Sequence, residues 1–343
     1  MVLLTGGTGL IGSHLLFQLI DRGERVRALY RRKESLEKVS TVFGYYSPRP
    51  DELMAQVEWI QGDITDICSL DRAFGDIQKV YHAAGLVSFD PKDKKRLEKI
   101  NVQGTAHVVN LCLKHRVEKL CHLSSISAIG QSKKGEMATE ENLWGDGLVS
   151  VYGQSKMDGE LEVWRGSQEG LGVVILNPGV VLGPGHWNEG SGSIFSYVAR
   201  EYKYYIPGGT GFVGVNDLVG AALAAMGSDI TSERFIVVGQ NLSYGELLQK
   251  LAVGLRVRPP SKRLPFFALE CLWRLDSLAS KLFGWRGRLP RALVKGLYQQ
   301  EIYCSEKIGK RLKIGLDGLD AEIRSSCSKF RNLDPRDPSI PRA

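Results

Sequence analysis

Three glycines near the start of the chain constrain its fold more than any other feature of the sequence. Gly6, Gly9 and Gly12 stand in the stretch 5–12, Thr-Gly-Gly-Thr-Gly-Leu-Ile-Gly, which follows the apolar run 2–4 and precedes apolar residues at helical spacing over 14–20. Glycines at a strand-to-helix turn let backbone N–H groups and the helix N-terminus approach a pyrophosphate. A glycine-rich loop without a ligand is the alternative, but the flanking strand and helix favour dinucleotide binding.

Short apolar runs alternate with helical segments from residue 1 to about 240, a pattern typical of a parallel sheet with crossover helices. The segment 40–56 contains glycine, tyrosine, serine and two prolines, so we predict a loop there. The fold class is therefore predicted to be α/β, with a doubly wound parallel sheet of the Rossmann type. The predicted strands are 2–4, 25–30, 57–60, 80–85, 120–125, 173–176 and 235–238.

The alternation breaks down after about residue 180, which divides the chain into three predicted parts. Residues 1–180 are expected to form the dinucleotide-binding domain, with late elements returning around 211–240. Residues 181–330 are expected to form a small C-terminal α/β substrate-binding region with lid helices, and 331–343 a flexible tail. The apolar segment 264–285 is a packed helix, a lid over an apolar substrate or a membrane-surface contact, and the sequence leaves these open.

Composition excludes several classes of protein. No run of about 18 apolar residues predicts a transmembrane helix, and the first strand starts too early for a signal peptide. The six cysteines include no Cys-x-x-Cys pair, so we expect reduced thiols, no metal site and a cytoplasmic location. The formal net charge is +7, yet no nucleic-acid module is present, which favours an anionic cofactor and a small-molecule substrate over nucleic acid.

Two arginines follow the second predicted strand, where dinucleotide folds often place an acid that binds the adenine ribose. Arg31 and Arg32 suit a 2′-phosphate by charge and by bidentate geometry, so we predict a preference for NADP(H) over NAD(H). A solvated basic turn is the alternative. Asp63, after the third strand, is a candidate acceptor for the adenine amino group or, equally, a turn-capping carboxylate.

A tyrosine and a lysine four residues apart indicate acid–base chemistry. Tyr152 and Lys156 share one face of a helix. An ammonium about 4 Å from a phenol, at an effective dielectric of ~20, contributes ~4 kcal/mol, which predicts a lowered tyrosine pKa. Ser124 and Ser125 end the fifth strand at the carboxyl edge of the sheet, where ligands bind. The pair alone would be an ordinary helix face, but together with the serines and the glycine turn it predicts a catalytic site.

With these motifs in order, the chain resembles the extended short-chain dehydrogenases/reductases over roughly residues 1–330. The resemblance implies that Tyr152 donates or accepts a proton, that Lys156 binds the nicotinamide ribose and lowers the tyrosine pKa, and that Ser125 is the catalytic serine. It rests on Thr5-Gly-Gly-Thr-Gly-Leu-Ile-Gly12, Gly62-Asp63, His82-Ala-Ala-Gly85, Asn101-Val-Gln-Gly-Thr105, Leu123-Ser-Ser125, Tyr152-x-x-x-Lys156 and Asn177-Pro-Gly-Val-Val-Leu-Gly-Pro-Gly185. The expected cofactor contacts are Gly6, Thr8, Gly9, Leu10, Ile11, Gly12, Arg31, Arg32, Asp63, Ile64, Ala83, Ala84, Gly85, Asn101, Ser124, Tyr152, Lys156, Asn177 and Pro178.

Departures from related subgroups narrow the expected reaction. Ile126-Ser127 stand where sugar-nucleotide dehydratases typically carry Asp-Glu, and Asn177-Pro178 where many epimerases have Arg-Pro. Asn-Pro is similar to dihydroflavonol reductases and their bacterial relatives, in which Arg31 falls at the NADP-selecting position. The resemblance thus implies an NADP(H)-dependent reductase of a carbonyl, or oxidase of an alcohol, on a small, partly apolar substrate. A nucleotide-sugar epimerase and a non-catalytic NADP(H)-sensing protein are the alternatives, and a homodimer through helices near 92–115 and 150–168 is possible.

Overall fold

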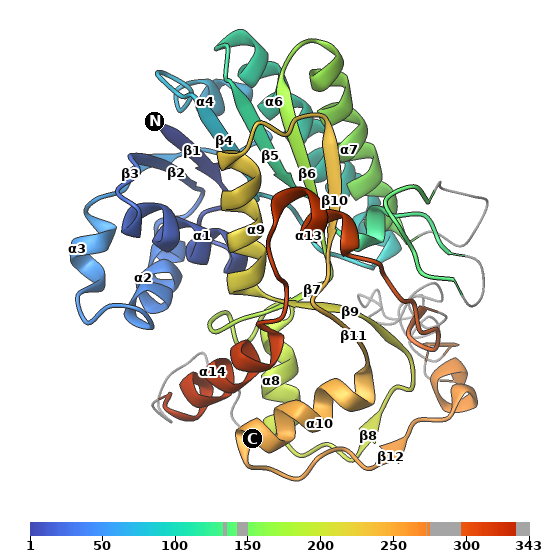
Figure 1. The fold of residues 1–343 in the computed structure, drawn as a ribbon. Coiled ribbons are helices and arrows are strands. Elements are labelled where there is room, and N and C mark those ends of the chain that lie inside the picture. The colour runs from blue at the N-terminus through green and yellow to red at the C-terminus, as the bar shows by residue number, and fades with distance from the viewer. Residues whose placement is uncertain (133–135, 143–149, 272, 275–295, 334–343) are drawn as a thin grey trace.

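A seven-stranded parallel sheet is the centre of the protein (Figure 1). The computed structural model describes residues 1–132, 136–142, 150–271, 273–274 and 296–333. The strand order is β10-β6-β5-β4-β1-β2-β3, so the first strand lies inside the sheet. This confirms the predicted Rossmann-type α/β fold. The strands are β1 (Val2–Thr5), β2 (Val26–Tyr30), β3 (Glu58–Gln61), β4 (Lys79–His82), β5 (Lys119–Leu123), β6 (Gly172–Pro178) and β10 (Glu233–Val237).

Helices cover both faces of this sheet because each presents an apolar stripe to it (Figure 1). In α1 (Leu10–Asp21), Leu15, Leu16, Leu19 and Ile20 are buried at helical spacing and pack with α9 (Val215–Gly227) on one face. On the other face, α6 (Gly104–Lys114) and α7 (Val151–Gln168) pack against each other and against the sheet. The short helix α4 (Ile67–Asp71) lies beside α6.

A smaller region lies beyond the carboxyl edge of the main sheet. Its three-stranded sheet has the order β11-β9-β7, and a two-stranded sheet pairs β12 with β8. The helices α8, α10 and α14 share a buried cluster with these strands, and α13 packs on β10. The elements are β7 (Val180–Leu182), α8 (Gly192–Ala199), β8 (Tyr204–Tyr205), β9 (Gly209–Gly214), β11 (Gln240–Ser243), α10 (Tyr244–Leu255), β12 (Lys262–Arg263), α13 (Glu306–Leu312) and α14 (Leu319–Arg331).

The loop predicted for residues 40–56 is wrong in part, because this segment contains helical structure. α2 (Leu36–Gly44) and α3 (Pro50–Met54) occupy most of it. Val39, Val42 and Phe43 are fully buried against α1, and this tertiary burial outweighs the weak helical propensity of the segment. Pro50 is at the first position of α3, where a missing N–H removes no helical hydrogen bond.

Two predicted segments lie partly outside the residues that the structure describes. The segment 264–285 is described only through 271 and at 273–274, and the expected tail 331–343 only through 333. No helix among the described residues is long and apolar enough to cross a bilayer, and those residues contain no cluster suited to a metal. A homodimer through α6 and α7 stays a prediction.

Candidate active site

A cavity of about 1100 Å³ runs along the carboxyl edge of the main sheet and continues to the smaller region. It contains most of the residues predicted to bind cofactor or to act in catalysis. Those that line it are Gly6, Thr8, Gly9, Leu10, Ile11, Gly12, Arg31, Arg32, Asp63, Ile64, Ala83, Ala84, Gly85, Ser124, Ser125, Tyr152 and Pro178. Residues separated by up to 172 positions in the sequence therefore meet in one cavity.

Gly6 and Gly12 of the glycine turn stand at positions where the neighbouring backbone leaves no room for a side chain. Gly6 has φ +74°, and a β-carbon on it would lie 2.5 Å from the Ala84 nitrogen. A β-carbon on Gly12 would lie 2.1 Å from the Gly6 oxygen. No side chain caps the N-terminus of α1, and no acidic residue lies in its first turn. The positive end of this helix is thus available to an anionic group at the cavity.

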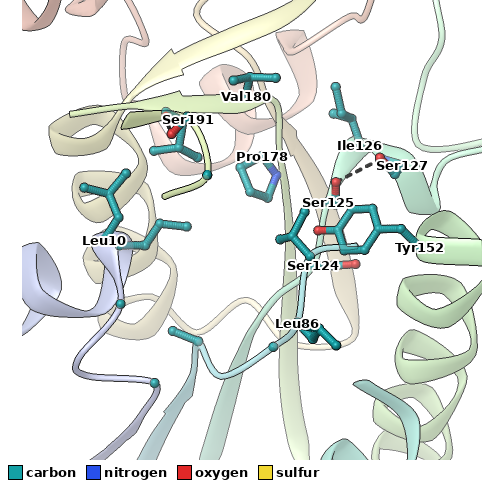
Figure 2. Close-up of a pocket in the computed structure, with 18 of the residues that line it drawn as sticks. Leu10, Leu86, Ser124, Ser125, Ile126, Ser127, Tyr152, Pro178, Val180 and Ser191 are labelled. Atoms are coloured by element: carbon teal, nitrogen blue, oxygen red, sulfur yellow. Dashed lines mark hydrogen bonds between the residues drawn. The ribbon is translucent and has the colours of Figure 1, made fainter. Parts of the chain in front are cut away.

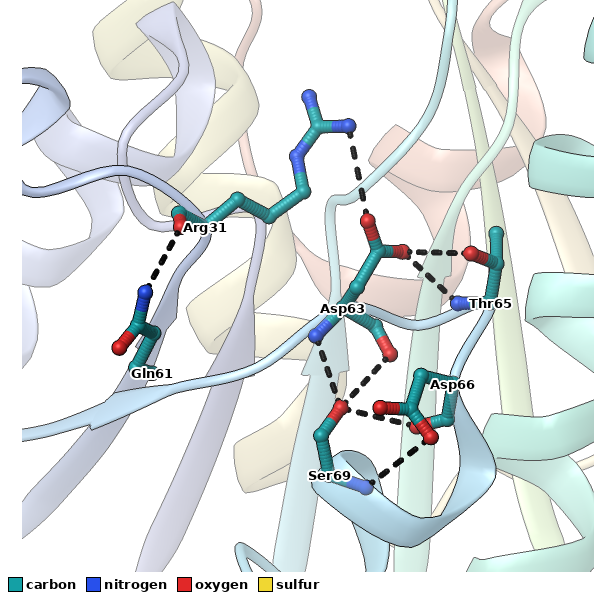
Figure 3. A network of polar contacts seen from close by, with 6 residues as sticks. All are labelled: Arg31, Gln61, Asp63, Thr65, Asp66 and Ser69. Carbon is teal, nitrogen blue, oxygen red and sulfur yellow. Dashed lines mark hydrogen bonds and ion pairs between the residues drawn. The ribbon is translucent and has the colours of Figure 1, made fainter.

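A basic group lines the cavity beside the glycine turn. Arg31, Arg32 and Lys38 reach it from the end of β2 and from α2. Asp63 Oδ1 accepts hydrogen bonds from the Thr65 nitrogen and hydroxyl, both at 2.9 Å, which is the turn-capping role considered from the sequence (Figure 3). Its other oxygen lies 3.9 Å from Arg31 Nη1, and both side chains remain well exposed.

Lys38 also makes an ion pair from one wall of the cavity to another segment. Its Nζ lies 2.6 Å from Oε1 of Glu189, in the connection between β7 and α8, and both residues line the cavity. Sequence analysis did not single out Lys38. The signal was the run of basic residues at 31, 32, 33 and 38, which α2 brings round to the same side of the cavity as the arginines.

Tyr152 and Ser125 meet at the ends of two elements (Figure 2). Ser150 caps α7 by accepting a hydrogen bond from the Gly153 nitrogen at 2.9 Å, which fixes Tyr152 in the first turn. Ser125 directly follows Ser124 at the end of β5, and its Oγ accepts from the Ser127 nitrogen at 3.1 Å. The Ser125 and Tyr152 side chains lie next to each other in the cavity wall. Burial raises the pKa of Tyr152, and the Ser125 hydroxyl opposes the increase.

Lys156 lies behind the cavity wall instead of lining it. Its Nζ donates to the Leu123 carbonyl oxygen at 2.8 Å and would be 3.8 Å from a β-carbon placed on Gly85, a lining residue. Burial lowers the pKa of Lys156 to about 8, while the Glu160 carboxylate opposes that change. The sequence predicted that Lys156 lowers the pKa of Tyr152. The structure differs: the ammonium is turned to the end of β5, and burial dominates the pKa of the tyrosine.

Two asparagines predicted to contact the cofactor support the lining of the cavity from behind, and their contact with the cofactor stays a prediction. Asn101, in a π-helical segment (Glu98–Gln103), accepts from the Leu86 nitrogen at 2.8 Å and donates to the Leu86 oxygen at 2.9 Å. It thereby holds the loop after β4. Asn177 Nδ2 donates to the Ser125 carbonyl oxygen at 3.0 Å. Both side chains are buried away from the cavity, because their amides satisfy backbone groups that would otherwise be unpaired.

Sequence analysis missed the buried carboxylate of Glu160. Its side chain is 2% exposed, accepts a hydrogen bond from Asn177 Nδ2, and lies 3.5 Å from Arg234 Nη1. Burial raises its pKa, and the Asn177 hydrogen bond and the nearby cations Arg234 and Lys156 oppose the increase. The sequence did contain a signal: Tyr152, Lys156 and Glu160 follow at intervals of four on α7 and so share one helix face.

The sheet order and the glycine turn are those of a Rossmann fold that binds a nicotinamide dinucleotide. The family model described as "NAD dependent epimerase/dehydratase family" matches residues 2–239. The chain therefore belongs to the NAD-dependent epimerase/dehydratase family and is an oxidoreductase or epimerase of that family.

Curated relatives extend over most of the chain. A protein of Synechocystis sp. with the provisional name dihydroflavonol 4-reductase is 27% identical over 96% of this chain and 94% of its own length. Sterol demethylase protein B of Methylococcus capsulatus is 29% identical over 73% of each chain. Among solved structures, UDP-glucose 4-epimerase from Thermotoga maritima is similar with a TM-score of 0.75, 21% identity and coverage of 96% of this chain and 98% of the other, a likeness of fold alone.

Proposed function

We propose that the protein uses NADP(H) to reduce the carbonyl, or oxidise the alcohol, of a small and partly apolar substrate. The observation that carries the proposal is the placement of the Ser125 and Tyr152 side chains next to each other in the wall of a cavity that also contains the glycine turn. The names of the relatives support a redox reaction, since the Synechocystis protein is provisionally named as a reductase. The nicotinamide, when bound, supplies or accepts the hydride.

Tyr152 is the proposed proton donor in the reductive direction. Its burial raises the phenol pKa, so the group keeps its proton at neutral pH and can transfer it to a substrate oxygen. Ser125 donates a hydrogen bond to the same oxygen. Lys156, with a pKa of about 8, is mostly protonated at pH 7, and its ammonium, beside Gly85 of the cavity lining, is the proposed group that holds the nicotinamide ribose.

The proposed NADP preference rests on charge at one end of the cavity. Arg31, Arg32 and Lys38 all line it, and guanidinium and ammonium groups bind a 2′-phosphate through charge-assisted hydrogen bonds. One carboxylate oxygen of Asp63 accepts hydrogen bonds from Thr65, and the other faces Arg31. Asp63 is therefore less available to bind ribose hydroxyls, as the acidic residue of NAD-binding folds does.

Tyr152→Phe tests the catalytic proposal. The variant keeps the ring but lacks the proton, so we expect NADPH oxidation to fall by 10²-fold or more, with NADPH affinity unchanged when followed by quenching of protein fluorescence. Tyr204→Phe, at an exposed tyrosine outside the cavity, is the matched control. Turnover by Tyr152→Phe equal to that of the control would refute the role.

An epimerase is the second candidate because the family includes epimerases. Such an enzyme oxidises and re-reduces one carbon on a retained cofactor. It would copurify with dinucleotide and convert a nucleotide sugar without net NADPH consumption, whereas a reductase consumes NADPH in proportion to product. A sensing protein without catalysis would bind NADPH and show neither activity, and the retention of both Tyr152 and Lys156 argues against it.

A further inference from the structure

The cavity continues past Tyr152 to a wall built by the segment 296–303. A bridge between Gly209 and Gln300 places this segment beside β9, and Asn241 holds Tyr303 through both backbone groups at 2.9 Å. Glu301 and Tyr303 thereby line the cavity together with Thr210 and Tyr244. These residues come from three separate parts of the chain, and none has a part in the mechanism described above.

Glu301 is the charged member of this group. Its Oε2 accepts a hydrogen bond from the Tyr303 hydroxyl at 2.5 Å. Burial raises the pKa of Tyr244 to about 12, and the negative charge of Glu301 adds to the effect, so the tyrosines stay protonated. Within the described residues, no Lys, Arg or His forms an ion pair with Glu301. Its charge is therefore not balanced by a described cation.

An apolar surface lies between this carboxylate and the proposed catalytic pair. Tyr303 packs in one buried cluster with Ile126 and Ile129, and all three line the cavity. Ile126 directly follows Ser125. A ligand whose carbonyl lies at Ser125 and Tyr152 would thus place an apolar portion on this cluster before it reaches Glu301.

We propose that Glu301, oriented by Tyr303, binds a hydrogen-bond-donating group of the substrate, a hydroxyl or an ammonium, separated from the reacting carbonyl by an apolar portion. A carboxylate at an apolar wall is stabilised by a donor or cation and repels an anion. This inference rests on the proposed reductase function and refines its substrate class. It disfavours substrates that would bring a diphosphate to this wall.

A series of methyl ketones tests the site. Linear ketones of matched length ending in a methyl, hydroxyl, ammonium or carboxylate group are assayed with NADPH and the wild-type enzyme, over several chain lengths. We expect kcat/KM to be highest for ammonium or hydroxyl ends and lowest for carboxylate. In Glu301→Gln the preference for ammonium over methyl should fall by about tenfold or more. Glu306→Gln, at an exposed carboxylate paired with Lys310, is the control and should retain the preference.

The outcomes separate this inference from the proposed function. Reduction of the ketones with no dependence on the terminal group, or with the same dependence in Glu301→Gln, overturns the donor site and leaves the reductase standing. No NADPH oxidation with any ketone overturns the reductase and the substrate class with it. The wild-type ranking is informative even if Glu301→Gln fails to fold, and Tyr303→Phe, which keeps the carboxylate but removes the hydroxyl that orients it, should weaken the ammonium preference less than Glu301→Gln does.

Discussion

Asn177 and Glu160 are joined by a hydrogen bond of 2.5 Å from Nδ2 to Oε1 beneath the candidate active site. The same amide nitrogen donates to the Ser125 carbonyl oxygen, and the same carboxylate influences the pKa of Lys156. One buried pair thus connects the residue proposed to hold the substrate oxygen with the residue proposed to hold the nicotinamide ribose. We infer that Glu160 positions the site without touching the substrate.

Glu160→Gln should change the pH dependence of turnover. The pKa of Lys156 is about 8, and Glu160 keeps it from falling lower, so the variant should lose the ammonium at a lower pH. In the reductive direction, the basic limb of the kcat profile should therefore move to lower pH. If the pKa of Lys156 falls by one unit, the charged fraction of the lysine falls about tenfold at any pH well above the pKa. Glu162→Gln, on the same helix but paired with Arg165, is the control. Identical profiles for the two variants would contradict the positioning role.

Gly12→Ala should destabilise the protein and prevent cofactor binding. The added β-carbon would lie 2.1 Å from the Gly6 oxygen, so the glycine turn has to move, at a cost of about 1–3 kcal/mol or more in the free energy of unfolding. Gly220→Ala is the matched control, since nothing lies within 4 Å of its β-carbon in α9. That control should be neutral or gain up to about 1 kcal/mol. Urea denaturation with and without NADPH measures both, and equal behaviour of the two variants would show that the close approach at Gly12 is unimportant.

Arg31→Ala and Arg32→Ala should reduce the selectivity for NADPH. A charge-assisted hydrogen bond to phosphate contributes about 1.5–3 kcal/mol, which corresponds to a rise of about 10- to 150-fold in the KM for NADPH. The KM for NADH should change little, since that cofactor has no 2′-phosphate. Arg49→Ala, an exposed arginine paired with Glu52, is the control. A wild-type preference for NADH would refute the NADP assignment outright.

Acid should destabilise the protein through buried histidines. Burial lowers the pKa of His14 to about 4, with its ring bonded to the Tyr46 hydroxyl and to the Pro184 carbonyl oxygen. The unfolded state takes up this proton near pH 6.5, whereas the folded state takes it up only near pH 4. The free energy of unfolding therefore decreases as the pH falls from 6.5 towards 4, by up to about 3 kcal/mol from His14 alone. The difference in unfolding free energy between pH 7 and pH 5 should shrink in His14→Gln. An unchanged difference in His14→Gln would exclude His14 as the source.

Local sequence patterns were sufficient to predict the alternating strands and helices and the features that depend on residues close together in sequence. The glycine turn, the strand ends and the helix face of Tyr152 and Lys156 all follow from spacing, and the structure gathers most of them in one cavity. Spacing does not fix the direction of a side chain. Asn101, Asn177 and Lys156 turn away from the cavity because unpaired backbone groups on other elements bind them. Glu301 could not be found from the sequence, since its surroundings come from segments 57 and 91 residues away at Tyr244 and Thr210.

The order in which the chain builds the main sheet and the smaller region limits which segments can be replaced by those of a relative. After β6 the chain leaves that sheet to build β7, α8 and β9, returns with α9 and β10, and leaves again for β11 and α10. The walls around Glu301 and Ile194 thus come from both excursions. A chimera with a single junction would combine one part of the cavity wall from one protein with the other part from its relative. Grafting a new specificity onto this scaffold requires replacement of at least two stretches, 180–214 and 238–333, with α9 and β10 left in place between them.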